Sequence, residues 1–210
     1  MAEPHAHDHH HPHQPDLEDT PPTHHQLMTE AVAGLLVEKG IVGADELRAT
    51  LEAIDQKRPA DGARLVARAW VDAGFRARVL EDVNAAAGEL DIDAGHIPIR
   101  AVANTAGLHN LVVCTLCSCY PRLLIGLPPD WYKARAYRAR AVREPRAVLR
   151  AFGLELPHDT TVRVHDSTAD LRYLVLPERP AGTDDWGEEE LAALVTRDCM
   201  IGTALPQVPV

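Results

Sequence analysis

Three cysteines lie close together near the middle of the sequence, in the segment VCTLCSCYP at residues 113–121. The thiols of Cys114, Cys117 and Cys119 can converge on one centre only if the backbone between them curls into a claw. Three unconnected thiols are an unfavourable interpretation, because clustered thiols at a surface oxidise readily. The segment therefore predicts a loop whose shape is set by what its sulfur atoms bind.

Two familiar kinds of cysteine site suit this loop poorly. Cys114-x-x-Cys117 has the spacing of a redox pair, but such pairs usually open a helix, and Pro121 and a third cysteine make that helix awkward. A structural zinc site needs four ligands in a tetrahedron. Only three sulfurs are local, so His109 or Cys199 would have to supply the fourth ligand. His109 is otherwise expected to be a hydrogen-bonded core histidine.

A claw for a transition metal is a third interpretation. Three thiolates would occupy three positions, and deprotonated backbone amides in the Cys117-Ser118-Cys119 stretch could occupy two more. A sixth position would stay open for a substrate. Strong amide and thiolate donors favour a low-spin trivalent ion over zinc.

Composition excludes several other classes. The chain has 210 residues, 46% of them hydrophobic and 25% charged, which suits a globular protein of one domain, or one domain and an arm. No apolar run approaches the length of a membrane helix, about 18 residues. The first residues lack a basic region followed by an apolar one, so we expect no secretory signal and a cytoplasmic location. The net charge of −10 argues against nucleic-acid binding.

The pattern along the chain predicts three parts. Residues 1–25 hold eight of the 12 histidines and almost no large apolar side chains, so we expect a disordered tail, either inert or metal-scavenging. Residues 26–95 carry thin apolar stripes at helical spacing, typical of a helical arm. Residues 96–210 mix strands and helices without a strict βαβ rhythm. Strands are expected at 97–103, 162–164 and 171–176, with an apolar run at 111–113, and helices at 131–141, 144–152 and 188–196. We expect an α+β fold, an N-terminal helical arm followed by a layered α-β-β-α core that carries the claw loop.

The claw segment resembles the metal-claw motif of nitrile hydratase α subunits and of the related thiocyanate hydrolase γ subunit. The stretches GLPPDWYKARAYRARAVREPRAVLRAFGLELP (126–157) and LRYLVLPERPAGTDDWGEEELAALVTRDCMIG (171–202) are also similar to that family. So are ANTAGLHNLVV, before the claw, and GARLVARAWVD at 62–72. The resemblance spans about residues 26 to 205.

The resemblance implies a set of ligands and their chemistry. Cys114, Cys117 and Cys119 would give sulfur ligands, and the amide nitrogens of Ser118 and Cys119 would complete the plane. Cys117 would become a sulfinic acid and Cys119 a sulfenic acid. The sulfenate would either attack the nitrile carbon or orient and deprotonate a water molecule. Members with Thr at position 115 usually carry cobalt, so Thr115 implies non-corrin cobalt(III), with iron(III) as the alternative.

The resemblance also implies partners. The modified cysteines would pair with arginines from a β-type partner subunit, so the active enzyme would be a hetero-oligomer, and an activator protein or metallochaperone would assist loading. The implied activity is that of a hydro-lyase, which hydrates a small-molecule nitrile to the amide: R–C≡N + H2O → R–C(O)NH2. Neither nucleic acid nor a membrane is an expected partner.

One position departs from the usual motif. Nitrile hydratases resemble CSCYPW here, whereas this chain has Arg122, as thiocyanate hydrolase does, and Asp198-Cys199 leans the same way. The segment before the claw and the LPPDWYK run lean toward nitrile hydratase. Arg122 predicts a polar pocket, unless it forms a salt bridge at an interface. Such a pocket suits a polar or heteroaromatic nitrile, such as the substrate of the related toyocamycin enzyme. Thiocyanate hydrolysis is the alternative, and a non-catalytic metal-binding or redox module is the alternative from another class.

Overall fold

The computed structural model describes residues 21–209, and the chain divides into two compact units, Met1–Ala49 and Thr50–Val210. In the first unit, α1 (His24–Glu38) begins at a capping box, in which Thr23 and Gln26 each accept a hydrogen bond from the other's backbone N–H. The next helix, α2 (Ala44–Gln56), crosses the division between the units. Of the expected tail, residues 1–20 lie outside the described residues, and His24 and His25 open α1.

Three helices follow in the second unit: α3 (Pro59–Val71), α4 (Ala73–Glu81) and α5 (Val83–Gly88). Pro59 stands in the first turn of α3, where its missing N–H costs no hydrogen bond. Asp72 caps α4 by accepting from the N–H of Phe75, and Asp82 caps α5 in the same way. The compact units divide at residue 49, and helices occupy most of residues 26–95, which we expected to form the helical arm.

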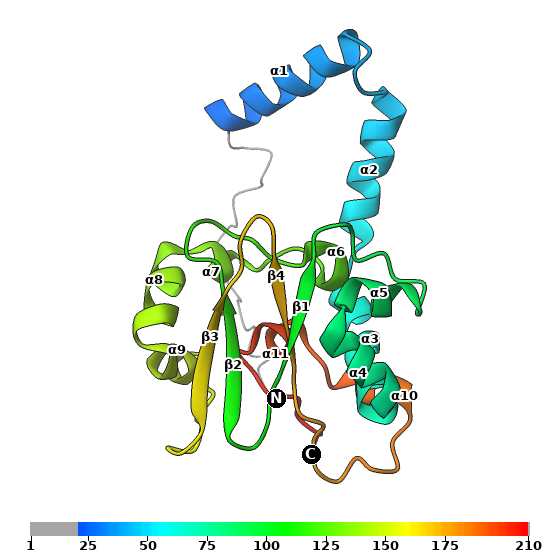
Figure 1. The fold of residues 1–210 in the computed structure, drawn as a ribbon. Helices are drawn as coiled ribbons and strands as arrows, with labels where there is room; N and C mark the ends of the chain where they lie inside the picture. Colours follow the sequence, from blue (N-terminus) through cyan, green and yellow to red (C-terminus); the bar gives the residue numbers. More distant parts are fainter. Residues whose placement is uncertain (1–20, 210) are drawn as a thin grey trace, which may run out of the picture. The chain divides into compact units, whose positions relative to one another are not determined.

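Four strands form two parallel pairs. β1 (Ile99–Ala103) pairs with β4 (Arg172–Leu176), and β2 (Leu108–Val113) pairs with β3 (Thr161–Asp166). Figure 1 shows α3 to α5 beside the β1–β4 pair, and α8 (Arg135–Arg143) and α9 (Pro145–Ala151) against β2 and β3. This arrangement confirms the α+β class and the layered α-β-β-α core.

Short helices complete the unit: α6 (Arg122–Ile125), α7 (Asp130–Lys133), α10 (Glu188–Ala193) and α11 (Arg197–Ile201). The helix expected at 131–141 is divided into α7 and α8, because Ala134 between them has an extended backbone. The helix expected at 188–196 ends at Ala193, and Thr196 caps α11 by accepting from the N–H of Cys199.

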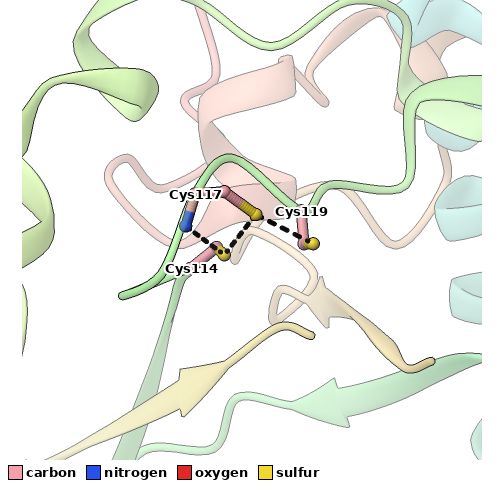
Figure 2. A group of neighbouring side chains, drawn as sticks. All are labelled: Cys114, Cys117 and Cys119. Atoms are coloured by element: carbon pink, nitrogen blue, oxygen red, sulfur yellow. Dashed lines mark hydrogen bonds between the residues drawn. The ribbon is translucent and has the colours of Figure 1, made fainter. Parts of the chain in front are cut away.

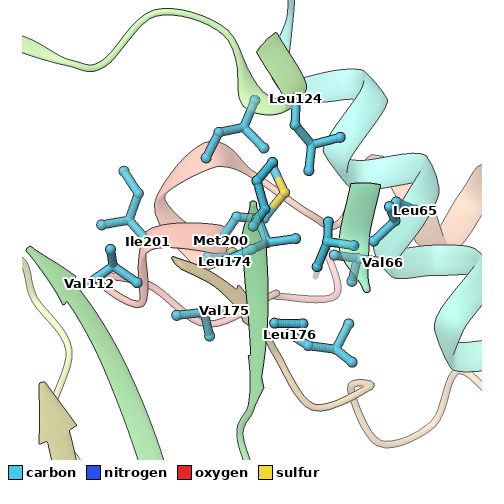
Figure 3. Packing of buried hydrophobic residues seen from close by; sticks show 14 of the residues in the cluster. Leu65, Val66, Val112, Leu124, Leu174, Val175, Leu176, Met200 and Ile201 are labelled. Carbon is cyan, nitrogen blue, oxygen red and sulfur yellow. The ribbon is translucent and has the colours of Figure 1, made fainter. Parts of the chain in front are cut away.

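The core lies between these layers, and it holds the two ends of the claw segment. Figure 3 shows Leu124 of α6 and Met200 of α11 packed with Leu65 of α3 and the buried residues of β4. An added Cβ at Gly62 would collide with the side chains of Ile125 and Met200, so α3 approaches α6 and α11 as closely as a glycine permits. None of the helices in residues 21–209 is long and apolar enough to cross a membrane.

Candidate metal centre

The three clustered cysteines converge at the end of β2 (Figure 2). The Sγ atoms of Cys114 and Cys117 lie 3.5 Å apart, those of Cys117 and Cys119 lie 3.4 Å apart, and all three lie within 4.8 Å of one another. Cys114 is fully buried, Cys119 is half-buried and Cys117 is exposed. The loop therefore has the claw shape predicted from the sequence, and the claw is open to solvent on one side.

Backbone amides turn toward the same centre. The N–H of Cys117 donates to Cys114 Sγ at 3.2 Å. Hydrogen bonds from the thiols of Cys119 and Cys114, and from the N–H groups of Ser118 and Cys119, lower the pKa of Cys117. Burial, with the hydrogen bond to Cys117, raises the pKa of Cys119 to about 12. The pKa values of the two thiols are thus shifted in opposite directions, and the Ser118 and Cys119 amides interact with the Cys117 thiol.

Three elements brace the loop. Thr115 donates to the Asp166 carboxylate from its backbone N–H at 2.9 Å and from its hydroxyl at 2.5 Å. The Arg138 guanidinium on α8 donates to the Thr115 carbonyl at 3.1 Å, and the Tyr132 hydroxyl on α7 donates to the Cys119 carbonyl at 2.8 Å. The claw is consequently tied to β3, α8 and α7 as well as to its own strand.

The sequence alone did not indicate a role in the site for these bracing residues. Asp166 lies two residues beyond the strand expected at 162–164, and only the register that places it opposite Val113 reveals its position beside the claw. Tyr132 and Arg138 belong to the DWYKARAYRAR run, which resembles the family and in which we expected a helix at 131–141. The available signal was the proximity of that run to the claw in the sequence.

A cavity of about 690 Å³ opens in front of the cysteines. Its lining includes Cys117, Ser118 and Cys119, together with three cationic side chains, Arg122, Lys133 and Arg172. Lys133 forms an ion pair with Asp130 at 3.0 Å, and the Arg122 side chain is exposed. The sequence predicted that Arg122 would line a polar pocket. In the structure Arg122 is part of a cationic wall of the cavity, and this wall lies beside the claw.

The structure does not supply a fourth zinc ligand among the described residues. Both ring nitrogens of His109 have partners, because Nε2 bonds to the Gly202 carbonyl at 2.7 Å and Nδ1 lies 3.3 Å from the Asn104 amide. Cys199 is buried in α11, with its Sγ 3.2 Å from the Thr196 hydroxyl. Within residues 21–209, the cluster of potential metal ligands contains the three claw cysteines alone. His109 is thus a core histidine.

The loop also lacks the helix on which a redox pair depends. Residues 114–121 have no helical turn, and the next helix begins at Arg122. All four cysteines are free thiols. Three converging sulfurs next to two amide nitrogens fit a thiophilic transition-metal ion in a site open on one side.

Comparisons with known proteins agree with this assignment. The family model described as nitrile hydratase, alpha chain, matches residues 23–204. The low-molecular weight cobalt-containing nitrile hydratase subunit alpha of Rhodococcus rhodochrous is 48% identical over 182 residues, which cover 86% of this chain and 88% of that protein. The thiocyanate hydrolase subunit gamma of Thiobacillus thioparus is 40% identical over 194 residues, covering 87% of this chain and 80% of that one. The crystal structure of a thiocyanate hydrolase mutant has a TM-score of 0.84 and 38% identity, and covers 90% of this chain and 93% of that chain.

Proposed function

The chain belongs to the nitrile hydratase α-chain family of enzyme subunits, and on this premise we propose that it is the metal-bearing subunit of a cobalt nitrile hydratase. The observation that carries the proposal is the convergence of three sulfur atoms within 4.8 Å, at the segment that resembles the family's claw. The cobalt named in the Rhodococcus rhodochrous relative supports the choice of metal. The reaction is the addition of water to a nitrile, which gives the amide.

The proposed ligands are the sulfur atoms of Cys114, Cys117 and Cys119 and the backbone nitrogens of Ser118 and Cys119. The N–H groups of Ser118 and Cys119 interact with the Cys117 thiol and lower its pKa, which supports this set. Thr115 is the proposed determinant of cobalt over iron. Since its hydroxyl is bound to Asp166, Thr115 would act by fixing the backbone of the loop and not as a ligand.

A trivalent cobalt ion held by these ligands supplies Lewis-acid activation of the C≡N bond. The chain's own groups carry out the remaining chemistry. Cys117 would be oxidised to the sulfinic acid and Cys119 to the sulfenic acid, a six-electron oxidation in all that requires an external oxidant such as dioxygen. The sulfenate oxygen of Cys119 would either attack the nitrile carbon or accept a proton from the water molecule that attacks it. In the first route a water molecule would then attack the sulfur, so that the original oxygen leaves with the amide and the sulfenate is restored.

The cationic cavity wall favours a polar substrate. The exposed guanidinium of Arg122 lines the space in front of Cys119, beside the ion pair of Lys133 and Asp130. A hydrogen-bonding heteroaromatic nitrile suits such a wall better than a plain aliphatic one does. The same wall favours the thiocyanate anion, and hydrolysis of thiocyanate is therefore the second candidate function.

The claw is also proposed to be completed by a β-type partner subunit in a hetero-oligomer. Cys117 and the neighbouring Leu116 are both exposed, which leaves this side of the claw accessible to another chain. Arginines of that partner would pair with the oxidised cysteines, and an activator protein would assist metal loading.

Native mass spectrometry of the chain coexpressed with its genomic neighbours in cobalt medium tests the proposal. We expect one cobalt ion, three added oxygen atoms on Cys117 and Cys119, and a bound partner subunit. Amide formation from nitriles then separates nitrile hydratase from thiocyanate hydrolase in the same preparation. Bound zinc, or a Cys114–Cys117 disulfide without metal, would instead support the non-catalytic metal-binding or redox module.

A further inference from the structure

Arg172 differs from the other cations of the cavity because it is partly buried and forms no ion pair within residues 21–209. It is the first residue of β4, where its N–H donates to the Pro98 carbonyl and its Cα lies opposite Ile99 in β1. The guanidinium Nη1 is fully buried and has no hydrogen-bond partner among the described residues. Removing a cationic N–H from water without a partner is unfavourable, so a residue in this state calls for an anion.

The anion can be identified from the lining of the cavity. Arg172 lies at the wall that also contains Cys117, Ser118 and Cys119. Arg122 is exposed and keeps its hydration, and Lys133 has Asp130 as its ion-pair partner. Among these three cations, Arg172 is thus the one with a nitrogen atom that lacks both hydration and an anionic partner, and it lies next to a claw ligand.

A metal-loaded claw has the complementary charge. The three thiolates and two deprotonated amides of the proposed ligand set outweigh the charge of a trivalent ion, so the loaded centre is an anion. We propose that Arg172 is a positioning residue that serves as the counter-cation of the loaded claw, acting on Cys119. This inference rests on the proposed function, and it adds a cation from this chain to the arginines expected from the partner subunit.

The proposal predicts opposite effects in the two states of the protein. Without metal, replacing Arg172 by glutamine removes an unpaired buried charge, and the complex should melt at an equal or higher temperature. With cobalt, the same replacement removes the counter-cation, and the complex should lose metal faster. A residue that only supports the fold would lower the melting temperature of both states.

The test compares Arg172→Gln and Arg172→Lys with the wild type, in complexes purified from cobalt-free and cobalt-containing cultures. Arg100→Gln is the matched control, because Arg100 is an exposed arginine on the paired strand β1 and does not line this cavity. The measurements are the melting temperature of the metal-free complex, the cobalt retained during timed exposure to a chelator, and the position of the sulfur-to-cobalt absorption band.

We expect Arg172→Gln to release cobalt at least about tenfold faster, in the range seen when groups supporting metal ligands are removed, with a shifted absorption band. Arg172→Lys should be intermediate, and Arg100→Gln should match the wild type. Equal cobalt release by Arg172→Gln and the wild type would overturn this inference alone, as would a lower melting temperature of the metal-free variant. A wild-type complex without cobalt would overturn the proposed function, and this inference with it.

Discussion

Thr115 is held to Asp166 by two hydrogen bonds, one from its backbone N–H and one from its hydroxyl. The carboxylate belongs to the last residue of β3, and the parallel register places it opposite Val113, the residue that precedes the claw. One acidic side chain therefore fixes both the main chain and the side chain of the first residue between two claw cysteines. The claw's shape depends on this contact as much as on its own sequence.

Replacing Asp166 by asparagine should weaken cobalt binding about tenfold to hundredfold, the range for groups that orient metal ligands. The amide keeps the size of the side chain but provides only one acceptor oxygen for the two donors of Thr115. Cobalt content after dialysis against a graded chelator series measures the effect. Asp159→Asn, an exposed change near the start of the same strand, is the control. Equal cobalt content in the two variants would show that the brace is dispensable.

Cysteine replacements distinguish the proposed ligands from the other buried thiol. Cys114→Ser and Cys119→Ser should each lose most of the bound cobalt, because a hydroxyl is a poor substitute for a thiolate toward this ion. Cys199→Ser should retain cobalt at the wild-type level, because its side chain contacts Thr196 and not the claw. Metal analysis of the purified complexes measures the cobalt content of each variant. Loss of cobalt from Cys199→Ser would contradict the proposed ligand set.

Two buried tyrosines provide a matched pair for the contact at Cys119. Tyr132→Phe removes the hydrogen bond to the Cys119 carbonyl, and Tyr137→Phe removes an equivalent bond to the Val112 carbonyl at 2.6 Å. Each change should destabilise the chain by about 1 kcal/mol in chemical unfolding. Only Tyr132→Phe should also shift the absorption band of the cobalt centre. The same band shift in both variants would indicate a general loosening of the fold.

The buried His109 predicts a dependence of stability on pH. Burial lowers the pKa of its imidazole, so the unfolded chain takes up a proton that the folded chain resists. Stability should therefore be full above about pH 6.5 and should fall below it, by at most about 1.4 kcal/mol per pH unit for this group. Burial also lowers the pKa of His165, which adds to the effect. Urea unfolding of the metal-free chain between pH 5.5 and 7.5 measures the slope.

His109→Gln should flatten that pH dependence, although it lowers the stability at every pH. His158→Gln, at an exposed position, should leave the slope unchanged. If His109→Gln and the wild type lose stability in parallel on acidification, another group is responsible for the slope.

Gly202→Ala should be among the most damaging single changes in the chain. Its φ is 91°, a left-handed conformation, and an added Cβ would collide with the backbone carbonyl of Asn110. The backbone cannot yield as a side-chain tip can, so we expect a loss of at least about 3 kcal/mol. Gly153→Ala has a similar φ of 82° with open space around it, and should cost only about 1–2 kcal/mol. Similar unfolding midpoints for the two variants would contradict the steric argument.

Local pattern predicted the parts of this molecule that depend on local sequence. Leu65 and Val66 follow helical spacing and lie in α3, and the claw cysteines converge as their close spacing requires. Pairing between distant segments was not predictable in this way. The parallel alignment of β2 with β3, which brings Asp166 to the claw, has no signature in either strand alone. Arg172 was missed for the same reason.

Short elements were the other source of differences. The break at Ala134 has neither proline nor glycine to announce it, and the five-residue helix α11 is too short to show a period. In both places tertiary contacts determine the backbone conformation, since single turns of helix are not stable by themselves.

The separation of Thr115 from Asp166 by 51 positions has a consequence for the order of events during synthesis. The three thiols leave the ribosome long before the strand that fixes their loop, because translation proceeds from the N-terminus. A nascent chain that ends before β3 has all the ligands but lacks the carboxylate that holds Thr115. The binding geometry therefore forms only after the long-range pairing of β2 with β3. The chain can capture the metal when its topology is complete, and not when the cysteine motif first appears.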